Sequence, residues 1–306
     1  MARSLASRLW RRVRRAAADA AAPDDSLPTI GDVDPRTLAG DAPIAFRCNL
    51  CGSPAHATLA GLSRETPSCP RCGSTVRFRA IGRLVVRELL GLDATLPQVA
   101  PRRDLVGLGL SDAASYAEPL ARVFAYRNTF FHAEPRLDIT AIDPGLRGRH
   151  DFVIASDVLE HVAPPVSRAF ANALALLRPG GVFVMTVPFG LAADTVEHYP
   201  ELHDWSLEPT QGTWRLVNRT VDGRVQHFDA PVFHGGPGTT LEMRLFSRDA
   251  LLREFERAGF TRVRIADEPY LPFGIHWPEP WSVPIVARAP SPSTAGSGLA
   301  RPSSRD

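Results

Sequence analysis

Four cysteines carry the clearest chemical signal in this sequence. Cys48 and Cys51 form one Cys-x-x-Cys pair, Cys69 and Cys72 form a second, and seventeen residues separate the pairs. Four thiolates at this spacing suit a tetrahedral Zn²⁺ ion. A glycine follows each pair, which lets the backbone turn tightly and point its amides at the sulfurs. Because four cysteine ligands leave no open position, we predict a structural zinc ion that does not activate water.

Four arginines near the second cysteine pair raise the question of nucleic-acid binding. A zinc ribbon can also hold RNA, and these side chains could contact its phosphates. The alternative is a solvated helix face, which the net charge of +2 and the lack of an aromatic platform beyond Phe78 favour. The four are Arg71, Arg77, Arg79 and Arg83.

A second informative stretch covers residues 151–190, where buried strands flank an amphipathic helix. The pattern predicts a strand from Phe152 to Ala155 and a helix whose apolar stripe runs from Val166 to Leu177. Pro179-Gly180-Gly181 are expected to end that helix. The next buried strand is predicted from Val182 to Val187.

Two motifs in this stretch resemble those of class I S-adenosylmethionine-dependent methyltransferases. The run from Asp157 to Val162 matches the Asp-x-x-Glu-His-Val that follows the fourth strand of such enzymes, and residues 178–181 match the Arg-Pro-Gly-Gly before their fifth. Residues 246–260 resemble their late helix, with Ser247 as N-cap and Gly259 as C-terminal stop. The resemblance implies a Rossmann-like fold, S-adenosylmethionine as cofactor, and methyl transfer.

The resemblance also implies a cofactor loop at residues 104–112, DLVGLGLSD. Gly107 and Gly109 match the first two glycines of Gly-x-Gly-x-Gly and would let the backbone approach the cofactor. Ser111 replaces the third glycine, and Leu105 stands where the family usually has an acid.

The same resemblance implies the remaining cofactor residues. The third strand is expected to end at residues 137–140, so that Asp138 binds the adenine amine next to Ile139, and Asp157 completes the pocket. The usual ribose-binding carboxylate is not obvious after the second strand, where only Asn128, Thr129 and Glu134 are polar candidates. The usual helix between the second and third strands is also missing from the pattern.

The residues after the fourth strand narrow the acceptor chemistry. The Asn/Asp-Pro-Pro-Tyr motif of amino-group methyltransferases of adenine and cytosine is absent, and no cysteine remains for covalent attack on a pyrimidine. We therefore expect an oxygen acceptor on a small polar molecule such as a sugar. Transfer to a hydroxyl needs a base or a metal at the attacking oxygen, and we assign that catalytic role to His161 and Glu160.

The run from Asp157 to His161 also resembles the Glu-x-x-Glu-His run that binds Mg²⁺ in some metal-dependent O-methyltransferases, with the aspartate Asp157 as the first ligand here. There a downstream histidine completes the site, and His203, His227 or His234 could supply it. The alternative is that Glu160 and His161 begin a helix and shape the cofactor pocket.

An insertion at residues 190–245 is rich in histidine and aromatic residues. We expect it to fold over the catalytic mouth and bind the acceptor, with a packing-only cap as the alternative. A hairpin is predicted to turn at Asp222-Gly223. The side chains in question are His198, Tyr199, His203, Trp205, Trp214, His227 and His234.

The whole chain of 306 residues divides into five predicted parts. They are a basic segment and linker (1–44), a zinc-ribbon-like module (45–76), a connecting helix (77–102), an α/β methyltransferase domain (103–288) and a disordered tail (289–306). The domain is expected to be doubly wound around a mostly parallel sheet. No apolar run reaches the roughly 20 residues of a membrane span, and a cytoplasmic protein is expected.

Three functions remain open from the sequence. The first is a small-molecule O-methyltransferase, the second an RNA methyltransferase that uses the zinc ribbon, and the third a non-catalytic zinc-binding descendant of the fold. The basic residues of the first twenty positions could also contact an anionic surface.

Overall fold

The computed structural model describes residues 34–234 and 240–291. The predicted basic segment before residue 34, with its arginines, and the predicted tail beyond residue 291 lie outside the described residues. Within the part described, no helix is long and apolar enough to span a membrane.

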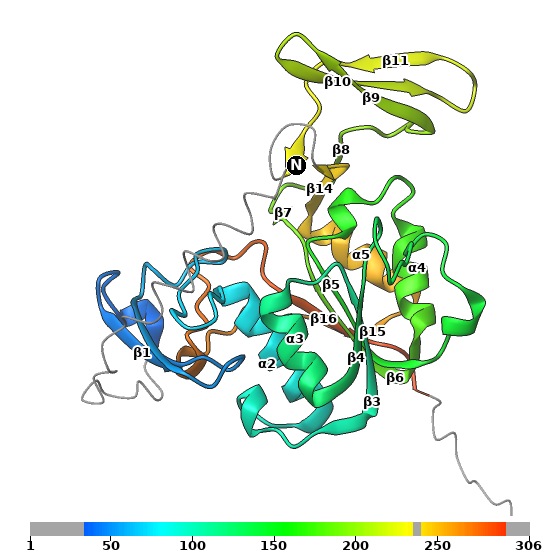
Figure 1. The fold of residues 1–306 in the computed structure, drawn as a ribbon. Coiled ribbons are helices and arrows are strands. Elements are labelled where there is room, and N and C mark those ends of the chain that lie inside the picture. Colours follow the sequence, from blue (N-terminus) through cyan, green and yellow to red (C-terminus); the bar gives the residue numbers. More distant parts are fainter. Residues whose placement is uncertain (1–33, 235–239, 292–306) are drawn as a thin grey trace, which may run out of the picture.

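A six-stranded sheet forms the centre of the molecule (Figure 1). The four strands β3, β4, β5 and β6 are mutually parallel, whereas β16 runs antiparallel to both of its neighbours. The predicted mostly parallel α/β architecture is therefore confirmed. In spatial order the strands are β15 (Thr261–Ile265), β16 (Ile285–Arg288), β6 (Leu177–Thr186), β5 (His150–Ser156), β3 (Arg102–Leu110) and β4 (Phe124–Thr129).

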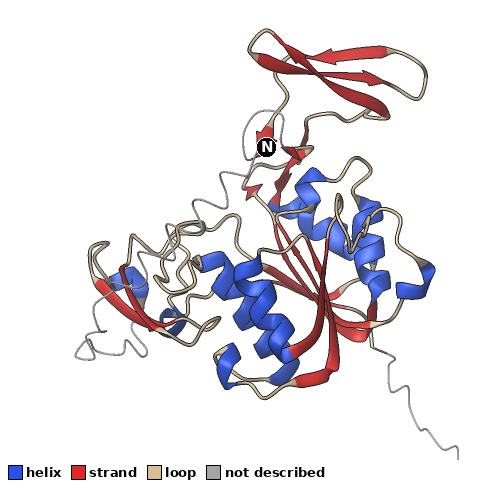
Figure 2. Ribbon diagram, viewed as in Figure 1, coloured by secondary structure: helices blue, strands red, loops and turns tan. Residues whose placement is uncertain are grey.

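Helices cover both faces of this sheet (Figure 2). Side chains alternate between the faces along each strand, so Phe152 and Ile154 of β5 join one buried cluster while Val153 and Ala155 join the other. The first cluster packs on α2 (Val76–Leu90) and α3 (Ala114–Val123), and the second on α4 (Ser167–Leu176) and α5 (Arg248–Ala258).

The late helix ends as its sequence predicts. Ser247 Oγ accepts a hydrogen bond of 3.1 Å from the Ala250 amide, and Gly259 ends α5 at φ 93°. The boundary between α4 and β6 differs from the prediction, because α4 ends at Leu176 and β6 already begins at Leu177. The Pro-Gly-Gly segment is therefore the first part of β6 and not a separate helix stop.

The prediction of a third strand ending at residues 137–140 is wrong, because the structure has no strand there. Among the described residues between β4 and β5, only Phe130 and Arg136 form a bridge, and it is isolated. A parallel strand at this edge needs one crossover to reach it and another to leave it, each of about a dozen residues or more. Only residues 130–149 separate the two strands. β4 is consequently the edge of the sheet.

The cysteine module packs into the same core as the sheet. Its hairpin of β1 (Pro43–Arg47) and β2 (Pro54–Thr58) places Ile44 and Phe46 in the buried cluster that also holds Phe152 and Val184. The short 3₁₀ helices of the chain are η1 (Pro35–Thr37), η2 (Leu96–Gln98), η3 (Pro144–Leu146), η4 (Leu159–His161) and η5 (Leu271–Phe273).

The insertion builds small sheets of its own. A three-stranded antiparallel sheet stands clear of the central sheet (Figure 1), and its β10–β11 hairpin turns at Gly223 as predicted. Short strands connect it to the domain. The strands are β7 (Phe189–Gly190), β8 (Val196–Glu197), β9 (Asp204–Thr210), β10 (Thr213–Arg219), β11 (Val225–Phe228), β12 (Phe233–His234), β13 (Thr240–Leu241) and β14 (Arg244–Ser247).

Candidate active site and metal centre

The four cysteine sulfurs lie together, as their spacing predicts. Their Sγ atoms are all within 4.8 Å of one another, with Cys48 3.6 Å from Cys72 and Cys51 3.7 Å from Cys69. The glycine after each pair closes a tight turn, but its amide donates to the carbonyl oxygen of Cys48 or Cys69 and not to a sulfur. This donor set fits a zinc ribbon.

The thiols strongly perturb one another. Contact with Cys51 raises the pKa of the Cys48 thiol, but contacts with Cys69 and Cys72 outweigh it and the pKa falls to about 6. Contacts with Cys48 and the other two thiols lower the pKa of Cys51, while those of Cys69 and Cys72 are raised. Cysteine binds a metal ion as the thiolate and releases its proton on binding, so four thiols this close together can bind one cation.

Replacing one of these ligands should destabilise the whole fold. We expect Cys69→Ser to lose bound zinc and about 4 kcal/mol or more of stability, because loss of a structural metal belongs to the largest single-site effects. Metal analysis and chemical denaturation of the purified protein measure both quantities. Thr66→Ala, at an exposed position of the same module, is the matched control. Equal zinc content and stability in all three proteins would contradict the assignment.

The arginines beside the second cysteine pair are mostly occupied within the protein. Arg79 is fully buried and donates to Ser74 O and Gly274 O, and Arg83 pairs with Asp93 at 2.8 Å. Both the predicted phosphate contact and the predicted solvated helix face are therefore wrong for these two side chains. Arg77 also points inward, to a network at the edge of the sheet.

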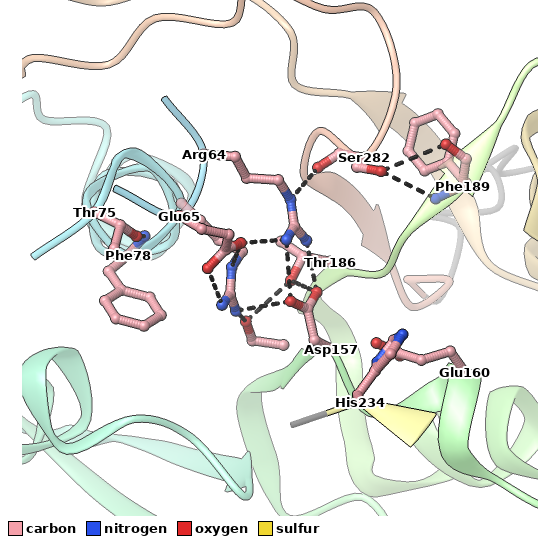
Figure 3. A network of polar contacts seen from close by, with 12 residues as sticks. Arg64, Glu65, Thr75, Phe78, Asp157, Glu160, Thr186, Phe189, His234 and Ser282 are labelled. Carbon is pink, nitrogen blue, oxygen red and sulfur yellow. Dashed lines mark hydrogen bonds and ion pairs between the residues drawn. The ribbon is translucent and has the colours of Figure 1, made fainter. Parts of the chain in front are cut away.

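That network joins the cysteine module to the carboxyl end of β5 (Figure 3). Asp157, the first residue after β5, accepts hydrogen bonds of 2.6 and 3.1 Å from Arg64, and Arg77 lies 3.2 Å from the same carboxylate. Thr186 at the end of β6 donates to it at 2.9 Å. Glu65 bridges the two arginines.

The two arginines keep Asp157 ionised. Burial alone would raise its pKa, but the charges of Arg64 and Arg77 outweigh burial and lower it. Asp157 has φ 53°, a left-handed conformation that is uncommon outside glycine. The sequence suggested Asp157 for the cofactor pocket but gave no sign of Arg64, which lies 93 residues earlier.

The two loop glycines are surrounded by protein side chains. A Cβ at Gly107 would lie 2.1 Å from the ring of Phe152, and one at Gly109 would lie 1.9 Å from the Tyr126 hydroxyl and 2.3 Å from Asp112 Oδ2. Close packing between neighbouring strands therefore requires glycine at both positions.

Asp112 is a buried acid that the sequence did not single out. It accepts a hydrogen bond of 2.6 Å from the Tyr116 hydroxyl and another from Tyr126. Its backbone is paired with the Asn128 side chain in both directions. Burial outweighs these hydroxyl donors and raises the pKa of Asp112 to about 7.

This raised pKa predicts a stability that depends on pH. Between the ordinary pKa near 3.8 and about 7, only the unfolded chain ionises Asp112, so stability should fall as pH rises through this window. We expect the wild-type protein to lose more unfolding free energy between pH 5 and pH 8 than Asp112→Asn does. Urea denaturation at the two pH values measures it, and equal losses in both proteins would refute the prediction.

The other residues predicted to bind cofactor lie in two places, the loop after β3 and the segment between β4 and β5. Ser111 is exposed at φ 57° directly after β3, and its amide donates to Thr129 O at 2.7 Å. Asp138 accepts two hydrogen bonds from Thr140 at one carboxylate oxygen. Ile139 is buried in the core, and its carbonyl accepts from Asn172 of α4.

Ser115 adds an unanticipated polar atom near the first of these places. It lies in the first turn of α3, whose N-cap residue Ala113 gives no side-chain hydrogen bond. Its hydroxyl is buried and has no hydrogen-bond partner in the part of the chain that the structure describes. An unsatisfied hydroxyl at the N-terminal end of a helix suits a carboxylate ligand.

Glu160 and His161 lie just beyond β5, held rigidly in η4. Arg244 is fully buried and donates to Leu159 O at 2.8 Å and to Val162 O at 2.7 Å. The side chain of Glu160 is also fully buried, and within residues 34–234 and 240–291 neither of its oxygens has a hydrogen-bond partner. Burial and the nearby charge of Asp157 raise its pKa well above the usual range.

His161 is held in one orientation by the insertion. Its Nδ1 lies 2.6 Å from Leu241 O, and because a carbonyl only accepts, Nδ1 carries the proton. Burial lowers the pKa of His161, so the ring is neutral near pH 7 and Nε2 carries a lone pair.

Only some of the insertion's histidines come near His161. His234 lies 3.2 Å from its Nε2, and His198 reaches the same group through Glu242 at 2.9 Å. His203 and His227 are exposed and lie in or beside the three-stranded sheet. The expectation that the whole insertion covers the catalytic mouth is therefore wrong: the segment around β12 and β13 approaches it, and the three-stranded sheet stands away from it.

Strand order and strand ends together define the class of protein. A mostly parallel sheet covered by helices on both faces, with polar residues gathered after β3 and β5, is a Rossmann-like arrangement with a ligand site at the carboxyl ends of its strands. The sequence pattern of a family described as "Methyltransferase domain" matches residues 98–265, more than half of the chain. The chain belongs to this family, and it is an S-adenosylmethionine-dependent methyltransferase.

Solved structures with a similar fold include other methyltransferases. The sugar N-methyltransferase KedS8 from Streptoalloteichus sp. is 14% identical, with a TM-score of 0.41 over 72% of this chain and 90% of that one. The Burkholderia thailandensis 1,6-didemethyltoxoflavin-N1-methyltransferase is 16% identical, with a TM-score of 0.36 over 69% and 77%. No curated protein matches the chain. Similarity at this level says nothing of the acceptor.

Proposed function

We propose that the enzyme methylates an oxygen atom of a small polar acceptor, such as a sugar hydroxyl. The observation that carries the proposal is the neutral His161, whose Nε2 lone pair stands just beyond the carboxyl end of β5, where ligands of open α/β sheets gather. A hydroxyl holds its proton far above neutral pH, so a group that takes or weakens that proton is what such an acceptor needs.

The cofactor supplies a methyl group bound to a positively charged sulfur. We propose that Gly107, Gly109 and Ser111 form the loop beside it, with Ser115 Oγ and the first amides of α3 at its carboxylate. Asp138, Ile139 and Asp157 belong to the same proposal. The two glycines let β3 pack closely on its neighbours, Gly107 on Phe152 of β5 and Gly109 on Tyr126 of β4.

The four cysteines are proposed to hold one structural zinc ion. Zinc fits the all-thiolate donor set, and thiolates persist in a reducing compartment, which supports a cytoplasmic location. The module then keeps Arg64, beside Arg77 of α2, on Asp157 at the carboxyl end of β5. Since Arg77, Arg79 and Arg83 have partners inside the protein, a small acceptor is favoured over RNA.

Calorimetry and methyl transfer test this proposal together. We expect the purified protein to bind S-adenosylmethionine and to transfer a labelled methyl group to hydroxyl compounds but not to RNA or amines. Asp138→Ala should weaken cofactor binding by about 1 kcal/mol, the value of one hydrogen bond. Absence of cofactor binding would indicate a non-catalytic protein, and labelled RNA or labelled amines would each overturn the proposed acceptor.

A further inference from the structure

A second cluster of metal-binding side chains lies outside the cysteine module. Glu160, His161 and His234 each place a ligand atom within 4.8 Å of the others. His161 Nε2 is 3.7 Å from Glu160 Oε1 and 3.2 Å from His234 Nδ1. The two residues from η4 thus meet one from β12 of the insertion, and Figure 3 shows His234 beside Glu160.

The protons on the two histidines can be assigned from their partners. His161 donates from Nδ1 to Leu241 O, which leaves Nε2 unprotonated. His234 contacts the Glu242 carboxylate through Nε2, so its proton is on that atom. With these tautomers two lone pairs face each other across 3.2 Å, an arrangement that a cation between the two nitrogens would stabilise.

A single proton would satisfy only part of this arrangement. It would join the two histidines but leave both oxygens of Glu160, in the described part of the chain, buried without a donor. A metal ion satisfies all three groups. With ligand distances of about 2.0–2.2 Å, the donors around such an ion lie about 3–4 Å apart, which agrees with the observed separations of 3.2 and 3.7 Å.

The surroundings are also those of a metal site. Ligating histidines usually donate their other ring N–H to a carbonyl or a carboxylate, which fixes the ring and makes the free nitrogen more basic. Here Leu241 O does this for His161 and Glu242 for His234, while His198 holds Glu242 at 2.9 Å.

We propose that Glu160, His161 and His234 bind one divalent first-row transition-metal ion. Two imidazoles and one carboxylate favour such an ion over Mg²⁺ or Ca²⁺, which prefer oxygen donors alone. Three protein ligands leave open positions, unlike the closed cysteine site. Glu160 closes the inner side, and the partly exposed His234, with 37% of its side chain accessible, lies on the outer side.

The open coordination positions of the metal ion could bind the acceptor of the proposed reaction. A hydroxyl oxygen bound there would release its proton to solvent more easily, because the cation stabilises the alkoxide. The alkoxide would then bond to the methyl carbon while the cofactor's sulfur leaves as a neutral thioether. His161 would then be a ligand and the metal-bound oxygen the nucleophile. This role rests on the proposed function, whereas metal binding itself does not.

A Mn²⁺ titration followed by electron paramagnetic resonance tests the site, with zinc left in the cysteine module. Thiolates favour zinc over Mn²⁺, so Mn²⁺ reports on the second site alone. We expect one bound Mn²⁺ per chain, lost in both Glu160→Gln and His234→Ala and kept in His227→Ala, an exposed control. Glu242→Gln should weaken binding about 10–100-fold, as removal of a ligand's partner does.

A parallel titration with Co²⁺, followed by absorbance, detects the site even if Mn²⁺ binds to it too weakly to be measured. If the wild-type protein binds neither ion beyond the cysteine site, or if the two ligand variants bind both ions unchanged, the inference is overturned. Circular dichroism checks the folding of each variant, and His234→Ala alters a partly exposed residue of the two-residue strand β12. If the protein binds the metal but methylates no hydroxyl compound, the proposed acceptor is refuted and the metal site stands. If methylation of hydroxyl compounds is undiminished after the metal is removed, the metal's role in the reaction is refuted and the proposed acceptor stands.

Discussion

His161→Ala is expected to lower the turnover number about 100-fold or more, the usual contribution of a positioned base or its equivalent. Affinity for S-adenosylmethionine should change little, because the ring of His161 faces His234 and Leu241 and not the β3–α3 loop. Labelled methyl transfer at saturating cofactor and calorimetry measure the two quantities. His227→Ala, at an exposed histidine of β11, should match the wild-type protein in both.

The pH profile sharpens this prediction. Burial lowers the pKa of His161 from its ordinary value of 6.5, so the unprotonated ring predominates at pH 7. Turnover should therefore be flat around neutral pH and fall only as the pH drops below 6.5. A His161→Ala enzyme with full turnover would show that this histidine only packs at the start of η4, and the search would move to His198 and His234.

Gly109→Val should destabilise the protein by about 3 kcal/mol, the upper part of the range for an overpacked core. The new Cβ would fall 1.9 Å from the Tyr126 hydroxyl, and β3 is paired with strands on both sides and cannot move away. The urea midpoint measures the loss. Gly190→Val, where a Cβ meets nothing within 4 Å and φ is not positive, is the matched control.

A double variant separates packing from cofactor contact. Tyr126→Phe removes the hydroxyl that the new side chain would strike, so it should recover part of the stability lost in Gly109→Ala. If Gly109→Ala instead keeps its full stability and loses only cofactor affinity, then glycine is required at this position by contact with the cofactor and not by packing against Tyr126.

Local patterns predicted most of the fold correctly. Ser247 and Gly259 mark the ends of α5, and a continuous apolar run marks β5, which is buried on both faces, because caps and such runs are set within a few residues. The missing third strand was harder to predict. Residues 137–140 resemble a strand, but whether a strand forms there depends on the length of both connections, which no local window contains.

The candidate site shows the same division. The cysteine cluster and the Glu160-His161 pair were found because their members are close in sequence or regularly spaced. His234 was one of three candidates for the second histidine, since only the return of β12 to η4 selects it. Arg64 and Asp112 gave no sequence signal, because an ion pair across 93 residues and a buried acid between two tyrosines exist only after folding.

The buried cluster shared by the cysteine hairpin and the central sheet makes the chain indivisible. Ile44 and Phe46 of the hairpin lie in the same cluster as Phe152 and Val184 of the sheet. The family's pattern begins only at residue 98, so a gene trimmed to that boundary would discard α2 and expose an apolar wall of the catalytic domain. The ribbon therefore cannot be exchanged like an appended module. If the four cysteines hold the proposed zinc ion, metal supply is also a condition for the fold of the catalytic domain.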